Sequence, residues 1–250
     1  YVFMDRRMVK DFLASPDVAN TISGGFYALL KVPELCDYVY EDIYVRLIAG
    51  DKRGACSYVM DLSSKDEDSL REWVLLVYAE VFVDFDRLVV NDAFNLVSAT
   101  LCDYPFPVLP LVPNGLTEIS LVRSNIKSLD GLPAGLQRLF IWQCDALNTV
   151  GVSGLFDLRH LEVNLSNIEC VYVPSGITNL VLQGLVNLKW VVLNHTRFQY
   201  FDVQGCYDLD WSCLNGVYAD KAVVMISETY LEINEPGFLF FIDPLQLDVF

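Results

Sequence analysis

One spacing of apolar residues repeats through residues 96–233, and this repeat limits the possible folds more than any single side chain does. Its clearest copy reads Leu116-x-x-Ile119-x-Leu121. Further copies follow at intervals of 19 to 22 residues, and they start at Leu136, Leu158, Ile177 and Phe198. A period of roughly 20–29 residues with this pattern is typical of leucine-rich repeats, in which each unit is one short strand plus a return segment.

The repeat predicts an α/β solenoid, a leucine-rich-repeat parallel-strand stack of about seven units, over residues 96–235. The outer two units fit the pattern less well, as terminal repeats commonly do. Residues 1–95 lack the repeat and predict an N-terminal helical block. Residues 236–250 are too apolar to be left in water, so we expect them to fold over the last repeat as a C-terminal cap.

Two stretches of the N-terminal block carry helix signals. Leu35, Val39, Ile43 and Leu47 are four residues apart, and Gly50 follows as a C-terminal stop. Ser64-Lys-Asp-Glu67 resembles a capping box and precedes an apolar face, which predicts a helix of about five turns. The face comprises Leu70, Trp73, Val74, Val77, Tyr78 and Val81. Residues 5–13 and 26–32 also suggest helices.

The helical block has two alternative roles. It could cover the apolar end of the solenoid, because a terminal strand would otherwise leave an open edge and an exposed core. It could instead be an adaptor module that recruits other machinery to a recognition solenoid. The sequence leaves both alternatives open.

Three units begin with Pro-x-Gly and an aliphatic residue, and these are Pro113-Asn-Gly-Leu116, Pro133-Ala-Gly-Leu136 and Pro174-Ser-Gly-Ile177. Together with Ser124–Pro133 they resemble the short leucine-rich repeats of bacterial type III secreted effectors, and similar repeats occur in some large-virus and protist proteins. The resemblance implies a solenoid that binds host proteins. The ubiquitin-ligase domain of some effectors is not carried over, because too little chain follows the repeats.

The asparagine that regular repeats use to bond turn backbone groups is replaced throughout. We call this the ladder position, and it holds Tyr104, Ser124, Cys144, Ser166, Leu185, Cys206 and Ser227. A leucine cannot pair the buried backbone groups of its turn. We therefore expect the return side of the solenoid to be irregular near Leu185.

The register of the repeat also predicts which side chains face outward. Alternation along each strand sends the aliphatic residues inward and the intervening residues to the concave face. One outward column is Glu118, Arg138, His160, Asn179, Tyr200 and Lys221. The next is Thr100, Ser120, Phe140, Glu162, Val181, Asp202 and Val223. The third is Cys102, Val122, Trp142, Asn164, Gln183, Gln204 and Met225.

Phe140 and Trp142 stand on one face of a single predicted strand, beside arginine side chains. Aromatic residues and arginine are the usual composition of interface hot spots. The candidate partner-binding residues are Arg138, Phe140, Trp142, Arg159, His160, Glu162, Asn164, Tyr200 and Asp202. The alternatives are that the helical block or the tail covers these aromatic rings, or that they are exposed without a partner.

Composition narrows the choice of partners and compartment. The formal net charge of −16 repels phosphate backbones, so we do not expect nucleic acid as a partner. The seven cysteines lack metal-binding spacing, and as reduced thiols they suggest an intracellular setting, including delivery into a host cell. Two glycosylation sequons, Asn164-Leu-Ser166 and Asn194-His-Thr196, point the other way. We expect a soluble chain with no membrane span, since no unbroken apolar stretch is long enough.

We find no catalytic signature in the sequence. The two histidines, His160 and His195, fall on different parts of the repeat, and we recognise no nucleophile elbow, phosphate loop or metal-ligand spacing. We therefore expect a non-catalytic protein-binding scaffold with neither cofactor nor metal. The alternatives are a structural or assembly subunit capable of self-assembly, such as a viral particle component, and an adaptor for a modifying enzyme.

Overall fold

The computed structural model describes residues 5–194, 197–226, 229–233 and 238–239. The chain forms two compact units. One contains Tyr1–Val83 and Leu88–Leu96, and the other contains Asp84–Arg87 and Val97–Phe250.

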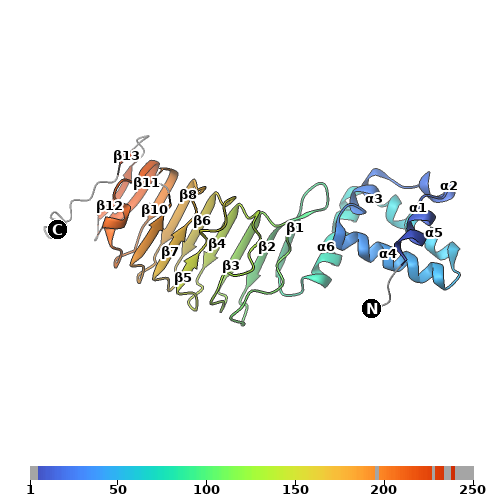
Figure 1. The fold of residues 1–250 in the computed structure, drawn as a ribbon, viewed down its shortest axis with the longest axis horizontal. Coiled ribbons are helices and arrows are strands. Elements are labelled where there is room, and N and C mark those ends of the chain that lie inside the picture. Colours follow the sequence, from blue (N-terminus) through green and yellow to red (C-terminus); the bar gives the residue numbers. More distant parts are fainter. Residues whose placement is uncertain (1–4, 195–196, 227–228, 234–237, 240–250) are drawn as a thin grey trace. The chain divides into compact units, whose positions relative to one another are not determined.

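The first unit is built from helices (Figure 1). They are α1 (Arg6–Leu13), α2 (Pro16–Ala19), α3 (Gly24–Leu29), α4 (Pro33–Ile48), α5 (Lys52–Ser64) and α6 (Glu67–Val81). The helix predicted from the four-residue spacing is confirmed as α4, whose residues Leu35, Val39, Ile43 and Leu47 are all buried. Gly50 follows with a φ of 77°, a left-handed conformation that glycine adopts without a Cβ clash.

The capping box predicted at Ser64–Glu67 is wrong. Ser64 is the last residue of α5, and α6 is capped by Asp66, whose carboxylate accepts a hydrogen bond from Ser69 N at 2.9 Å. Asp and Ser are both good N-cap residues, so the sequence alone did not separate them. The helix has 15 residues, which at 3.6 residues per turn is about four turns rather than five.

Helix α5 was not predicted. Its buried face consists of Ala55, Val59, Leu62 and Ser63, of which two are small or polar, so the apolar period is weak. Its start carries a signal that could have been used, because the Asp51 carboxylate accepts a hydrogen bond from Gly54 N at 2.7 Å.

The second unit is a β-solenoid of about six turns with parallel strands. In this unit the main sheet, sheet A, has the strand order β2-β3-β4-β6-β8-β10-β11-β12, with β13 also paired to β11 (Figure 1), whereas most of β1 belongs to the first unit. The strands are β1 (Arg87–Val90), β2 (Leu96–Cys102), β3 (Glu118–Val122), β4 (Arg138–Trp142), β6 (His160–Asn164), β8 (Asn179–Gln183), β10 (Arg197–Val203), β11 (Tyr218–Ile226), β12 (Thr229–Ile233) and β13 (Phe238–Leu239).

The return side of three turns forms a second parallel sheet, sheet B. It contains β5 (Thr149–Gly151), β7 (Cys170–Val173) and β9 (Trp190–Leu193), in that order. The irregular return side expected near Leu185 is therefore wrong. Leu185 is fully buried, and β9 follows it in regular register with β7. A short 3₁₀ helix, η1 (Trp211–Leu214), comes after β10.

Serine and cysteine take over the hydrogen bonds of the ladder position. Ser124 Oγ donates to the carbonyls of Leu101 and Val122 at 3.3 and 3.0 Å. Cys206 Sγ contacts the Leu182 and Gln204 carbonyls at 3.3 and 3.8 Å. These short donors pair buried backbone groups that would otherwise be left unsatisfied. The solenoid thus keeps its turns without the asparagine of regular repeats.

Each turn changes direction just past its sheet A strand at a residue with positive φ, which we call the corner position. Its occupants are Asp103, Arg123, Gln143, Leu165, Gly184 and Gly205. Glycine adopts this conformation freely and short polar residues tolerate it, whereas an aliphatic side chain is strained there. Arg123 and Gln143 also carry the cost of a positive φ, and Leu165, with a φ of 50°, is the aliphatic member of this set.

The solenoid interior contains the aliphatic residues of the repeat. Leu116, Ile119, Leu121 and Leu139 expose 1% of their surface or less. At the C-terminal side of the stack, β12 and β13 pair antiparallel with β11. Two of the residues predicted to form a C-terminal cap, Phe238 and Leu239, pair in this way, whereas residues 236–237 and 240–250 of that prediction lie outside the described residues.

Candidate functional site

The strand register aligns the columns predicted from the repeat, but the exposure predicted for three of their members is wrong, because Val181, Asp202 and Val223 are buried. Thr100, Ser120, Phe140, Glu162, Val181, Asp202 and Val223 are consecutive partners across the parallel strands. The columns through Arg138 and through Trp142 are aligned in the same way. Sheet A therefore presents an ordered grid of side chains.

Strand β4 is the most exposed part of this grid. We call its outward residues Arg138, Phe140 and Trp142 the β4 stripe. Arg138 and Trp142 are exposed, and Phe140 between them is half-buried. Trp142 leaves 49% of its surface accessible. Arg138 Nε donates to Glu118 Oε2 at 2.6 Å, and the Phe140 ring lies 5.1 Å from the His160 ring. The stripe thus combines an accessible indole with a fixed guanidinium.

The neighbouring strand β6 carries a polar group beside the stripe. Glu162 accepts a hydrogen bond from Asn164 Nδ2 at 2.7 Å, and its other oxygen lies 3.4 Å from His160 Nε2. All three residues are half-buried. Asn164 Oδ1 is buried without a hydrogen-bond partner, so this group has an unused acceptor. The structure therefore brings these three predicted site residues together next to Phe140.

Asp202 and Tyr200, also predicted site residues, lie further along the same face. Asp202 exposes only 1% of its surface. Its carboxylate accepts hydrogen bonds from Tyr200, Gln183 and Gln204, at 3.1, 2.8 and 3.1 Å to Oδ2, and from Gln204 N at 3.2 Å to Oδ1. The donors pair the buried charge. Asp202 therefore orders this part of the face rather than offering it a free carboxylate.

Arg159 lies at the edge of the predicted site. Its guanidinium donates to the carbonyls of Phe156 and Leu158 at 2.7 and 3.1 Å. Gly176 leaves room for it, since a Cβ there would lie 2.3 Å from Arg159 Nη1. The Arg159 side chain is thus held by carbonyls of its own loop. Arg138, by contrast, lies on strand β4 beside Phe140 and Trp142.

Sheet B carries an apolar strip that the sequence reasoning missed. Tyr172, Trp190 and Val192 expose 41%, 52% and 42% of their surfaces. The register pairs Tyr172 with Val192, and Trp190 with Cys170, so the three side chains share one outward face. The short apolar runs at 170–173 and 190–193, rich in valine and aromatic residues, were the signal that could have identified it.

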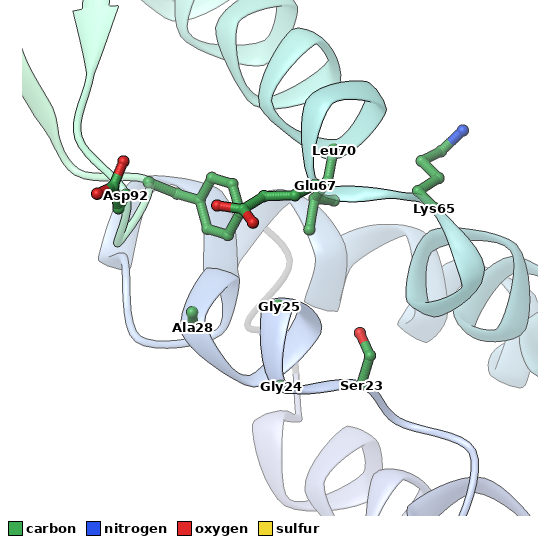
Figure 2. A pocket seen from close by; sticks show the side chains of 9 residues that line it. Ser23, Gly24, Gly25, Ala28, Lys65, Glu67, Leu70 and Asp92 are labelled. Atoms are coloured by element: carbon green, nitrogen blue, oxygen red, sulfur yellow. The ribbon is translucent and has the colours of Figure 1, made fainter.

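Two hollows lie within single units. In the helical unit, a hollow of about 390 Å³ lies between Gly24, Gly25 and Ala28 on one side and Glu67 and Leu70 on the other, as Figure 2 shows. Its two carboxylates are already paired, because Arg71 Nη2 lies 3.6 Å from Glu67 and 3.1 Å from Asp92. The Lys65 side chain points away from the hollow (Figure 2).

The second hollow, the corner pocket, follows the turns just past β6 and β8 and measures about 450 Å³. Its lining consists of Asp145, Leu165, Ser166, Asn167, Gly184 and Val186. Leu165 and Val186 expose 52% and 51% of their surfaces. The pocket begins one residue past Asn164, the strand partner of Trp142, so it adjoins the β4 stripe.

The buried thiols of the solenoid are held in the neutral form. Burial raises the pKa of Cys206 to about 12, and burial also raises the pKa of Cys144 above its ordinary value. A thiol needs its thiolate form to act as a nucleophile or metal ligand. These two cysteines therefore serve as small hydrogen-bonding core residues.

Over the described residues, we find no cluster of three or more His, Cys, Asp or Glu side chains arranged to hold a metal ion. A helix of sufficient length and apolar character to cross a membrane is also absent from that part of the chain. Comparisons with protein-family models, curated proteins and solved structures found no match to the chain.

Proposed function

We propose that this protein is a non-catalytic interaction protein that binds a protein partner on the outward face of sheet A. The observation that carries the proposal is the β4 stripe, where a half-exposed Trp142 stands beside Phe140 and a salt-bridged Arg138. Residues of this kind, fixed on a rigid strand, contribute most of the binding free energy in many interfaces. Glu162, Asn164 and His160 would form the polar surround.

We further propose that the solenoid is of the leucine-rich-repeat class with about seven units, its outward face being the concave one. Support comes from the period of 19 to 22 residues and from the aligned Leu-x-x-Leu-x-Leu strands. The Pro-led unit openings extend the proposal to the effector-like members of that class, and to a host protein as the partner.

An intracellular setting, including delivery into a host cell, belongs to the same proposal. All seven cysteines are free, and Cys144 and Cys206 use their thiols as buried hydrogen-bond donors. Such thiols persist best in a reducing compartment.

The test begins with affinity purification of the full chain and mass spectrometry, followed by calorimetry with the recovered partner. Trp142→Ala should weaken binding by about 2 kcal/mol or more and leave the unfolding midpoint unchanged. Trp190→Ala is the matched control, because Trp190 is equally exposed but lies on sheet B. Equal affinity of the wild type and Trp142→Ala would reject the β4 stripe as the binding surface.

A second candidate function is that of an assembly subunit, and the apolar strip of sheet B favours it. Tyr172, Trp190 and Val192 form a continuous exposed apolar surface of the kind found at subunit interfaces. Light scattering of the purified chain tests this candidate. A concentration-dependent oligomer that Trp190→Ala dissociates would support it, and a monodisperse monomer would count against it.

A further inference from the structure

The corner pocket has apolar walls where the other turns of the solenoid are polar or have no side chain. At the corner position, the other turns hold aspartate, arginine, glutamine or glycine, whereas this turn holds Leu165. Leu165 is held in the left-handed region at a φ of 50° with half of its surface in solvent. An exposed, strained leucine contributes little to the core, so its position calls for a role at the surface.

The Leu165 side chain packs over the next corner residue, which is glycine. Gly184 has a φ of 63°, and a Cβ there would lie 2.7 Å from Leu165 Cδ2. Gly205 follows on the next turn, where a Cβ would lie 3.2 Å from Gly184 Cα. Two successive corners therefore lack side chains, and the hollow lies between the exposed side chains of Leu165 and Val186.

The charged group of the pocket is a carboxylate. Asp145 lines the pocket and has no ion-pair partner among the described residues. The remaining polar lining is largely occupied, because Ser166 Oγ bonds Cys144 N and Asn164 O, and Asn167 accepts a hydrogen bond from Asn187. The pocket thus offers aliphatic contact and one uncompensated negative charge.

We propose that the corner pocket binds a lysine or arginine side chain of a protein partner. The aliphatic stem of such a side chain would lie against Leu165 and Val186, and its cationic head would pair with Asp145. The chain's net charge of −16 also attracts a basic partner, as the Asp145 carboxylate does locally. This proposal rests on the proposed function, because the corner pocket lies at the edge of the sheet A face where that function places the protein partner.

The test uses a random peptide library displayed on phage and selected on the immobilised full chain. The strongest binder is then synthesised, and its affinity is measured by calorimetry. We expect the selected peptides to carry Lys or Arg next to an apolar residue. Leu165→Asn and Asp145→Asn should each weaken binding at least tenfold. Val192→Asp is the control, because Val192 is about as exposed as Val186 of the pocket but lies on sheet B. This variant should bind as tightly as the wild type.

Leu165→Asn also separates a binding role from a structural one. Asparagine tolerates the left-handed conformation better than leucine, so the unfolding midpoint should not fall while binding is lost. The proposal is overturned if the library yields no binder, if the selected peptides lack basic residues, or if both pocket variants bind within twofold of the wild type. Binding that is lost in Trp142→Ala but kept in both pocket variants would remove this inference and retain the proposed function.

Discussion

The two units of this protein differ in whether their hydrogen bonds repeat along the chain. In the solenoid, each contact recurs one turn later, as when Ser124, Cys144 and Cys206 all donate to a carbonyl of the preceding turn. In the helical unit, a contact such as the Ser63 bridge between Thr21 and Ser23 joins chain segments about 40 residues apart. A position in the solenoid can therefore be judged from its equivalents on other turns, whereas a position in the helical unit has to be judged from its own partners.

The largest expected effect is the loss of a fully buried aromatic ring in either unit. Phe201 of the solenoid and Phe26 of the helical unit are both completely buried. Each change to alanine should destabilise the unit that holds it by about 3–5 kcal/mol, because it removes apolar contact and leaves a cavity. Urea unfolding followed by circular dichroism measures both. Leu76→Ala, at a residue that is 66% exposed, is the control and should change little. A cost below about 1 kcal/mol for either phenylalanine would contradict the described cores.

A single hydrogen-bond bridge should matter next. Ser63 Oγ accepts from Ser23 N at 2.6 Å and donates to the Thr21 carbonyl at 2.7 Å, and Ser63 is buried. Ser63→Ala leaves both backbone groups unpaired, so we expect a loss of about 1–3 kcal/mol in thermal or urea unfolding. Ser57→Ala, at an exposed serine of the same helix, is the matched control. Equal stability of the two variants would show that the bridge does not form.

Relief of strain at the corner position should have a smaller effect of opposite sign. Leu165→Asn places a residue that tolerates positive φ where leucine does not, and we expect it to stabilise the solenoid by about 1 kcal/mol. The measurement is the urea midpoint of the variant against the wild type. A clear loss of stability would show that the exposed leucine has a packing role.

The smallest effect at neutral pH is expected for Cys206→Ser, because serine already occupies the equivalent positions 124 and 166. The difference should appear in alkali. The pKa of Cys206 is raised by burial to about 12 from an ordinary value of 9.0, so its contribution to stability is present below pH 9 and is lost as the pH rises toward 12. Unfolding at pH 8 and pH 10 should show the wild type losing more stability than the variant. A pH-independent difference between them would contradict the buried neutral thiol.

The period of the repeat was sufficient to predict the register of the solenoid. The Leu-x-x-Leu-x-Leu spacing placed Phe140 and Trp142 outward because strand alternation has a period of two and the aliphatic residues must be buried. The same reasoning missed sheet B, because its strands are only three or four residues long and their alternation is brief. It also predicted an irregular return side near Leu185, where packing of a buried leucine replaced the missing polar contact.

Other features depend on contacts that a repeat pattern does not contain. The burial of Asp202 follows from three side chains that converge on it from β8, β10 and the turn after β10. Arg159 is held by its loop because Gly176, 17 residues later, leaves room for the guanidinium. Half of the buried face of helix α5 is small or polar, so its apolar period is too weak to predict. Such features arise from tertiary packing, which overrides local preference.

The central claim is that aliphatic residues of successive turns share one interior while the residues between them face outward. An alanine scan of strand β4, from Arg138 to Trp142, tests this most directly by urea unfolding. Leu139→Ala and Ile141→Ala should each cost about 2–5 kcal/mol, whereas Arg138→Ala and Trp142→Ala should each change stability by less than about 1 kcal/mol. A profile without this alternation, or one with its maxima at positions 138 and 142, would contradict the account.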